Sequence, residues 1–160
     1  MAWRIGLRGR LARTRAAVLA CAAACGAGAV HAGVLADRES YVAQMDRVDA
    51  EYRAASERCD DLAGNPRRVC VAEARAERRI AHSELAAQQK NTPKALYDAR
   101  VARAEAEFDV AKERCGELAG HPRERCVADA RAAEARAKSA ARIAREEAET
   151  RDRLRPAGGS

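Results

Sequence analysis

The cysteines are the residues of this 160-residue chain with the clearest chemistry. Four of the six form two pairs with the same spacing, Cys59 with Cys70 and Cys115 with Cys126. Paired thiols either close disulfides or bind a soft metal ion. Cysteines eleven positions apart lack the close spacing of common zinc motifs, and an even set in an oxidising compartment favours disulfides. We therefore expect two disulfides, and a metal- or redox-responsive site using the four cysteines is the alternative.

The other polar residues form no pattern typical of an active site. His121 lies between a glycine and a proline and is expected to be a turn residue, and His82 is expected on a solvated helix face. No nucleophile and base motif or glycine-rich phosphate loop occurs, and Asp and Glu alternate with Arg at the spacing of an exposed, ion-paired helix. We expect no catalytic residue, no metal site and no cofactor, so the chain is not expected to be an enzyme.

Residues 1–32 have the pattern of a secretory signal peptide. A positive region without acidic residues precedes an apolar stretch from Ala16 to Val30, which is too short for a stable membrane span. The stretch ends in small residues suited to cleavage after Ala32. The alternative is a lipoprotein processed at Cys25, which three alanines precede and a glycine follows. The sequence predicts export to the periplasm, with an outer-membrane lipoprotein as the alternative.

The basic excess of the chain lies almost wholly in this signal. Five of its 30 basic residues and none of its 24 acidic residues precede residue 33, so residues 33–160 have a formal net charge of +1. A nearly neutral exported chain has no basic surface excess for nucleic acid. We expect no nucleic-acid partner and no membrane span after signal cleavage.

The strongest pattern is an internal repeat at an offset of 56 residues. Residues 50–76 and 106–132 are identical at 17 of 27 aligned positions, including both cysteines and the Ala-Gly and proline positions of the bend. Such an ordered set of matches indicates duplication of one structural unit. Each unit is expected to have the same structure.

Within each unit, the composition and periodicity predict two long helices. Alanine, arginine and glutamate favour helix, while β-branched and aromatic residues are scarce. Apolar residues step by four and three through each first half. These two seams are Tyr41, Met45, Val48, Tyr52, Ala55, Cys59 and Leu62, and Tyr97, Val101, Ala104, Phe108, Ala111, Cys115 and Leu118. The second halves are expected to turn alanines inward: Ala74 and Ala81 with Leu85, and Ala130, Ala133, Ala137 and Ala144.

Glycine and proline predict a bend between the two halves of each unit. Gly64 and Gly120 suit a left-handed backbone, Pro66 and Pro122 suit a first helical turn, and Asn65 is a candidate N-cap. An antiparallel hairpin then brings the cysteines of one unit together, which predicts Cys59–Cys70 and Cys115–Cys126. A continuous helix would instead pair cysteines between repeats, and the glycine and proline break argues against it.

The expected fold is therefore all-α, with two tandem antiparallel hairpins of four long helices, each stapled by a disulfide near its bend. Thr92 as N-cap and Pro93 as first helical residue separate the hairpins. The expected helices are 37–63, 66–90, 93–119 and 122–150. The expected organisation is a signal peptide over 1–32, hairpins over 33–90 and 91–150, and a disordered tail over 151–160. Whether the hairpins pack together and whether the protein is a homo-oligomer remain open.

The ERC, LAG, P-R and CVA-(D/E)-ARA elements of the repeated unit resemble a group of small alanine-rich envelope proteins of Gram-negative proteobacteria. These proteins are often provisionally called "cell envelope biogenesis protein TolA". True TolA is similar only in its long Ala/Lys/Glu-rich helical region, and has in addition an inner-membrane anchor and a globular C-terminal domain. The resemblance implies a place in the cell envelope and no particular activity. We expect a structural or interaction protein of the periplasm, with a holdase-like role as one version, whose partner is an unidentified envelope component.

Overall fold

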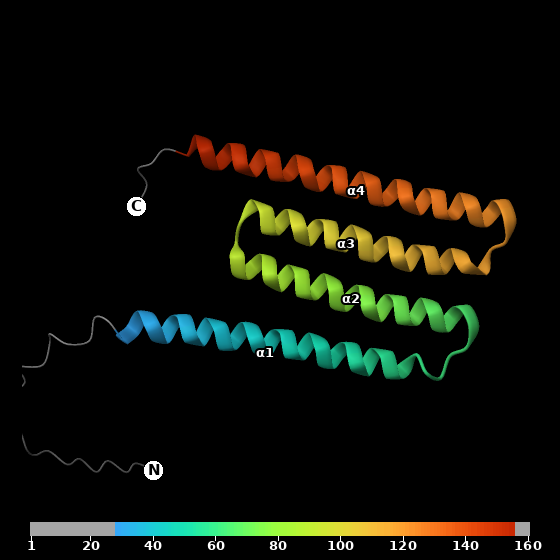
Figure 1. The fold of residues 1–160 in the computed structure, drawn as a ribbon, viewed down its shortest axis with the longest axis horizontal. Coiled ribbons are helices and arrows are strands. Elements are labelled where there is room, and N and C mark those ends of the chain that lie inside the picture. Colours follow the sequence, from blue (N-terminus) through green and yellow to red (C-terminus); the bar gives the residue numbers. More distant parts are fainter. Residues whose placement is uncertain (1–27, 156–160) are drawn as a thin grey trace, which may run out of the picture. The chain divides into compact units, whose positions relative to one another are not determined.

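The computed structural model describes residues 28–155 and contains, in this part of the chain, four α-helices and one short 3-10 helix (Figure 1). They are α1 (Gly28–Arg58), α2 (Gly64–Lys90), α3 (Pro93–Arg114), η1 (Cys115–Glu117) and α4 (Gly120–Leu154). The expected all-α fold of two tandem hairpins is confirmed. Most of the expected signal peptide and the last five residues of the expected tail lie outside the described residues.

The contacts divide the chain into two units, residues 1–35 and residues 36–160, and the packing below is that of the second unit. Successive helices of this unit run antiparallel and lie beside one another in chain order (Figure 1). α3 packs against α2 on one side and against α4 on the other, while α2 and α4 do not pack together over their described lengths. The two hairpins therefore meet through α2 and α3, a question that the sequence left open.

The buried side chains of this unit are small. Those on the helices and bends comprise eight alanines, Val110, Cys59 and Cys115. Two clusters join α2 to α3, one of Ala76, Ala106 and Val110 and one of Ala87, Ala95 and Ala99. Alanine lets helices approach closely, but each buried methyl group contributes only about 0.8 kcal/mol. Covalent staples are therefore expected to carry a large share of the stability.

α1 and α3 end earlier than expected. The helices were predicted to reach Ala63 and Ala119 but end at Arg58 and Arg114. At each cysteine the backbone changes to the tighter i to i+3 bonding: the Leu62 amide donates to the Cys59 carbonyl at 3.2 Å, and Leu118 donates to Cys115 at 3.1 Å. Residues 59–62 and 115–118 thus form turns that close each helix at its disulfide.

The predicted glycine bends are present, although each glycine leads into the following helix. Gly64 and Gly120 have φ angles of 64° and 57°, the left-handed backbone that favours glycine. α2 and α4 begin at these glycines, so Pro66 and Pro122 lie in first turns as predicted. The predicted N-cap at Asn65 is wrong, because its side chain makes no capping hydrogen bond. Its Oδ1 accepts instead from Arg68 Nη2 at 2.9 Å.

The connection between α2 and α3 agrees with the sequence. Thr92 Oγ1 accepts from the Ala95 amide at 3.1 Å, and Pro93 is the first residue of α3. Asn91 takes the left-handed conformation with φ of 45°, and its amide donates to the Ala87 carbonyl at 2.8 Å. The hairpins are thus joined by a tight turn in which hydrogen bonds cap the end of α2 and the start of α3.

The outer ends of α1 and α4 extend further than predicted. α1 begins at Gly28 rather than residue 37, so the predicted cleavage position lies within this helix. α4 continues to Leu154 rather than Thr150, so a disordered tail beginning at residue 151 is wrong. The Arg153 Nε donates to the Glu149 carbonyl at 3.2 Å. Basic side chains in the last turn also stabilise the helix end, because they lie near the negative end of its dipole.

The first seam of each hairpin faces its partner helix with two exceptions. The described seam residues from Tyr41 to Cys59 and from Tyr97 to Cys115 are half-buried or buried. Leu62 and Leu118 remain 40% and 44% exposed because the helix has already ended there. α3 also has a second stripe, which the sequence analysis missed: it faces α2 and contains Ala95, Ala99, Ala106 and Val110.

The predicted inward stripe of α4 is partly wrong. Ala133 and Ala137 are exposed, whereas Ala141 is buried and Glu134 and Lys138 are partly covered. Alanines occur on every side of α4, so their spacing alone does not identify the covered face. The cross-helix ion pair of Lys138 lies on the face that packs against α3.

Candidate functional site

The two disulfides have the predicted pairing and the same position in each hairpin. Cys59 pairs with Cys70 and Cys115 with Cys126, with Cα atoms 5.7 Å and 5.8 Å apart. Cys59 is completely buried and Cys115 is 1% exposed, so the first cysteine of each hairpin is inaccessible to solvent. The four cysteines are brought together as two separate pairs rather than as one four-thiol cluster.

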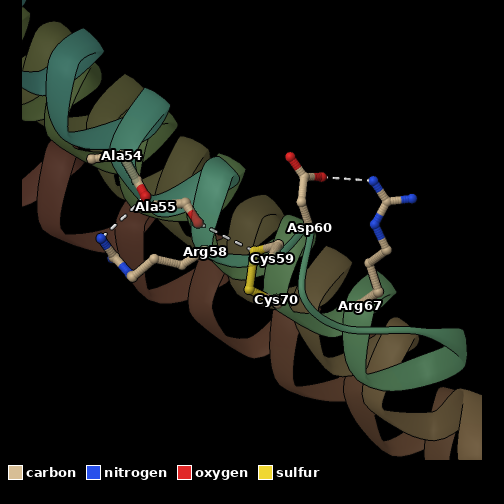
Figure 2. The surroundings of a disulfide bond; sticks show 7 residues. All are labelled: Ala54, Ala55, Arg58, Cys59, Asp60, Arg67 and Cys70. Carbon is tan, nitrogen blue, oxygen red and sulfur yellow. Dashed lines mark hydrogen bonds and ion pairs between the residues drawn. A yellow bond between two sulfur atoms is a disulfide. The ribbon is translucent and has the colours of Figure 1, made fainter.

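Figure 2 shows how the first disulfide ties the end of α1 to the first turns of α2. Asp60, in the turn after α1, pairs with Arg67 of α2 at 2.8 Å, on the exposed side of the same bend (Figure 2). Arg58 Nη1 donates to the Ala54 carbonyl at 3.2 Å within α1. The bend is thus closed by one covalent bond and one exposed ion pair, and an ion pair in water adds at most about 1 kcal/mol.

A contact between a basic and an acidic side chain occupies the same repeat position in the middle of each hairpin. In the first, His82 Nε2 lies 3.0 Å from Asp49 Oδ1, which also accepts from Arg78 Nε at 2.7 Å. In the second, Lys138 Nζ lies 2.8 Å from Glu105. His82 is therefore a partly covered residue facing α1, and its expected place on a solvated face is wrong.

These contacts shift the pKa values of Asp49, Glu105 and Lys138. The Arg78 hydrogen bond is the largest cause that lowers the pKa of Asp49, and His82 lowers it further. The Lys138 hydrogen bond lowers the pKa of Glu105, and Glu105 together with Glu134 raises the pKa of Lys138. Each shift favours the charged form, as opposite charges in contact do. These groups strengthen hairpin pairing and are not poised as acids or bases.

Both hairpins also place an arginine over a tyrosine ring. The Arg78 guanidinium lies 5.0 Å from the Tyr52 ring centre, and that of Arg145 lies 5.5 Å from the Tyr97 ring centre. Exposed cation–π contacts of this kind contribute about 0.5–1 kcal/mol. Tyr52 and Tyr97 thus each contact the second helix of their own hairpin.

Ion pairs flank the alanine contact between the hairpins. Arg114 and Glu73 are 2.7 Å apart and Arg68 and Glu113 are 3.5 Å apart, while two further pairs join Arg79 to Glu105 and Arg103 to Glu84. All are at least partly exposed, so each contributes little free energy. Their arrangement along α2 and α3 favours this register, because a shift would separate the paired charges.

One close contact between the repeats escaped the sequence analysis. A Cβ at Gly116 would lie 2.6 Å from Asn65 Oδ1, so the bend of the first hairpin packs directly on the η1 turn of the second. The repeat equivalent of Gly116 is Asp60, and that of Asn65 is His121. These are two of the ten positions at which the repeated units differ, so the residues themselves carry no specific signal for this contact. His121 is exposed at its bend and contacts Glu124 at 2.9 Å, as a turn residue does.

The exposed surface carries several large apolar side chains. Ile143 and Leu154 of α4 are 52% and 78% exposed and lie on the open surface of its last turns together with Glu146, Glu147, Thr150 and Arg151. Val42 on α1 and Leu96 on α3 are also exposed. The last turns of α4 have no counterpart in α2, which ends at the position equivalent to Glu146. Apolar side chains beside charges are suited to contact with another macromolecule.

Among residues 28–155 no group of three or more His, Cys, Asp or Glu side chains is arranged to hold a metal ion. None of the helices described is both long and apolar enough to cross a bilayer. No protein-family model matches this sequence, and neither a curated protein nor a solved structure matches it.

Proposed function

We propose that this protein is a non-catalytic structural or interaction protein of the bacterial periplasm, which binds another envelope component through exposed helix faces. The observation that carries the proposal is the exposed apolar end of α4, where Ile143 and Leu154 lie among charged residues. The signal-like residues 1–32 and the disulfides support the compartment, because disulfides form and persist in oxidising environments.

A holdase-like role is the version of this function that can be tested without knowing the partner. Unfolded chains expose apolar segments, and a surface with apolar side chains ringed by charges can hold such a segment while remaining soluble. The stapled hairpins would keep that surface in place because the disulfides restrict unfolding of the helices that carry it.

The test measures aggregation of a chemically unfolded client with the oxidised protein at equimolar amounts. We expect the protein to suppress light scattering, and the paired change Ile143→Ser with Leu154→Ser to weaken suppression severalfold. The matched control is Ala133→Ser, an exposed position on α4 away from Ile143 and Leu154. Unchanged scattering with the wild-type protein would remove the holdase role.

The compartment is tested separately by releasing the periplasm of the native host. We expect the protein in the released fraction, without residues 1–32. Retention in the cytoplasm with the first residues intact would contradict the proposal. Acylation at Cys25 and recovery with outer membranes would establish the lipoprotein alternative, and four free thiols with bound metal would establish the metal- or redox-responsive one.

A further inference from the structure

The contact between the two hairpins has a counterpart at each open side of the array. α2 meets α3 through Ala72, Ala76, Ile80 and Ala87, and shifting these positions by the repeat offset of 56 gives Ala128, Ala132, Arg136 and Ile143 of α4. All four are exposed, and together they form the α4 outer face. α4 therefore presents, without a partner among the described helices, the face that α2 uses to bind the next hairpin.

The complementary face is on α1. The α3 residues that meet α2 are Ala95, Ala99, Ala106 and Val110, and their repeat equivalents are Glu39, Ala43, Ala50 and Ala54. These exposed residues, with Asp46, form the α1 outer face. At the centre of both faces alanine is retained, at Ala50 and Ala132, which occupy the places of Ala106 and Ala76 in the buried cluster.

Of the four shortest ion pairs between α2 and α3, one keeps its signs on the outer faces and one becomes a pair of like charges. The other two each lose a partner, because Arg79 and Glu84 are replaced by Ala135 and Ala140. The Arg114 and Glu73 pair becomes Arg58 facing Asp129, which keeps its signs. The register that pairs Ala76 with Ala106 also places Arg136 opposite Asp46. One pair turns unfavourable, because Arg68 and Glu113 are replaced by Glu124 and Glu57.

We propose that a second copy of this chain is a partner of this surface, with the α1 outer face of one copy docked on the α4 outer face of the next. In repeat arrays, polar residues on a terminal face normally act as caps that stop addition. Here Asp46 and Arg136 have opposite signs and lie in register, so they favour addition. Because the two faces differ, the contact is head to tail and generates rings or open chains rather than two-fold symmetric dimers. The inference rests on the proposed function only in naming one partner for its exposed helix faces.

The test is sedimentation of the full protein, purified after export with its disulfides intact, over a range of concentrations. We expect the average mass to rise with concentration beyond that of a dimer. Ala132→Glu, which faces the acidic α1 outer face, and Ala50→Arg, which faces the basic side of the α4 outer face, should each weaken association at least tenfold. The matched control Ala133→Glu introduces the residue that the first repeat has at this position, Glu77, and should leave association unchanged.

Mixing the two variants distinguishes this contact from other kinds of association. Ala132→Glu keeps an intact α1 outer face and Ala50→Arg keeps an intact α4 outer face, so an equimolar mixture should form dimers and nothing larger. A monomeric wild-type protein at all concentrations, full assembly by either variant alone, or a mixture that stays monomeric would each overturn the proposal. Client protection is measured separately at concentrations where the protein is monomeric, so either idea can fail alone.

Discussion

At the scale of single residues, the disulfides reinforce a core whose buried side chains are mostly alanine. Each disulfide spans a sequence separation of 11, for which restriction of the unfolded chain contributes about 3 kcal/mol. Each buried alanine methyl contributes about 0.8 kcal/mol. One disulfide therefore counts for as much as several buried contacts of this core.

Replacing one pair of cysteines by alanine tests how much each disulfide contributes to stability. We expect Cys59→Ala with Cys70→Ala to lower Tm by about 10 °C, because roughly 3 kcal/mol is lost in a domain of this size. Replacing Cys115 and Cys126 in the same way is the matched variant and should have a similar effect, because the two bends have the same geometry. Thermal unfolding followed by circular dichroism measures both, and an unchanged Tm would contradict the stapling role.

The contact of Asn65 with Gly116 predicts coupling between the two repeats. Gly116→Ala places a methyl group against the Asn65 side chain and should cost about 1 kcal/mol through overpacking. Asn65→Ala removes the obstacle, so the double variant should be more stable than the two separate losses imply, with a coupling above about 0.5 kcal/mol. Purely additive free energies of unfolding in denaturant would show that the two bends do not touch in solution.

The ion pair of Glu105 predicts a pH-dependent contribution to stability. Its pKa is lowered from 4.5 by Lys138 and Arg79, so its contribution is present above that value and is lost as the pH falls through the folded pKa. The pKa of Lys138 is raised from 10.5, so the contribution is also lost at strongly alkaline pH. Glu105→Gln should lower Tm between about pH 5 and pH 10 and have little effect at pH 2.

Glu107→Gln is the control for this pH dependence, because Glu107 is exposed and lies 3.8 Å from its only described ionic partner, Arg103. It should change Tm little at any pH. A Glu105→Gln effect as large at pH 2 as at pH 7 would attribute the loss to packing and contradict the role of the ion pair.

At this scale the sequence predicted the cysteine pairing well and the other contacts between helices poorly. The pairing follows from two cysteines flanking one glycine and proline bend, which is local information. The Asn65 contact with Gly116 and the His82 contact with Asp49 depend on the register of neighbouring helices. Residue types alone do not specify that register in helices with alanine on several faces.

At the scale of helices, α3 differs from the others because it packs on two sides. One stripe contains the heptad positions that face α4, and the other faces α2 with Ala95, Ala99, Ala106 and Val110. Its equivalent in the first repeat, α1, has only the first stripe covered within the described unit. The same duplicated sequence thus has a buried face in one copy and an exposed face in the other.

A pair of equivalent substitutions tests this asymmetry. Ala106→Leu enlarges a side chain that is 2% exposed and should cost about 1–3 kcal/mol through overpacking between α2 and α3. Ala50→Leu, at the same repeat position on α1, is exposed and should change stability by less than about 0.5 kcal/mol. Urea unfolding at low protein concentration measures both, and equal effects would contradict the packing of the two hairpins described here.

The existence of the four helices was predictable, while their ends and the covered face of α4 were not. Composition and the two breaks locate the helices because alanine, arginine and glutamate lose little free energy in a helix. The ends at Arg58 and Arg114 depend on i to i+3 bonds at the cysteines, which have no residue signature of their own. On α4, alanine surrounds the helix, so Ala133 and Ala137 could not be distinguished from Ala130 and Ala144.

At the scale of the whole molecule, the residues described form a small repeat array, which two disulfides and contacts between small alanine side chains hold together. Such an array keeps long helix faces exposed, which suits an interaction protein, and depends on an oxidising environment for its disulfides. Stability and the proposed function therefore both depend on export and disulfide formation.

The most direct test of export and disulfide formation is the intact mass, measured without reductant, of the protein recovered from its host's envelope. We expect a chain that begins at Gly33 and lacks four hydrogens, with peptide mapping that joins Cys59 to Cys70 and Cys115 to Cys126. A chain that retains residues 1–32, or one whose four cysteines are free thiols, would contradict it.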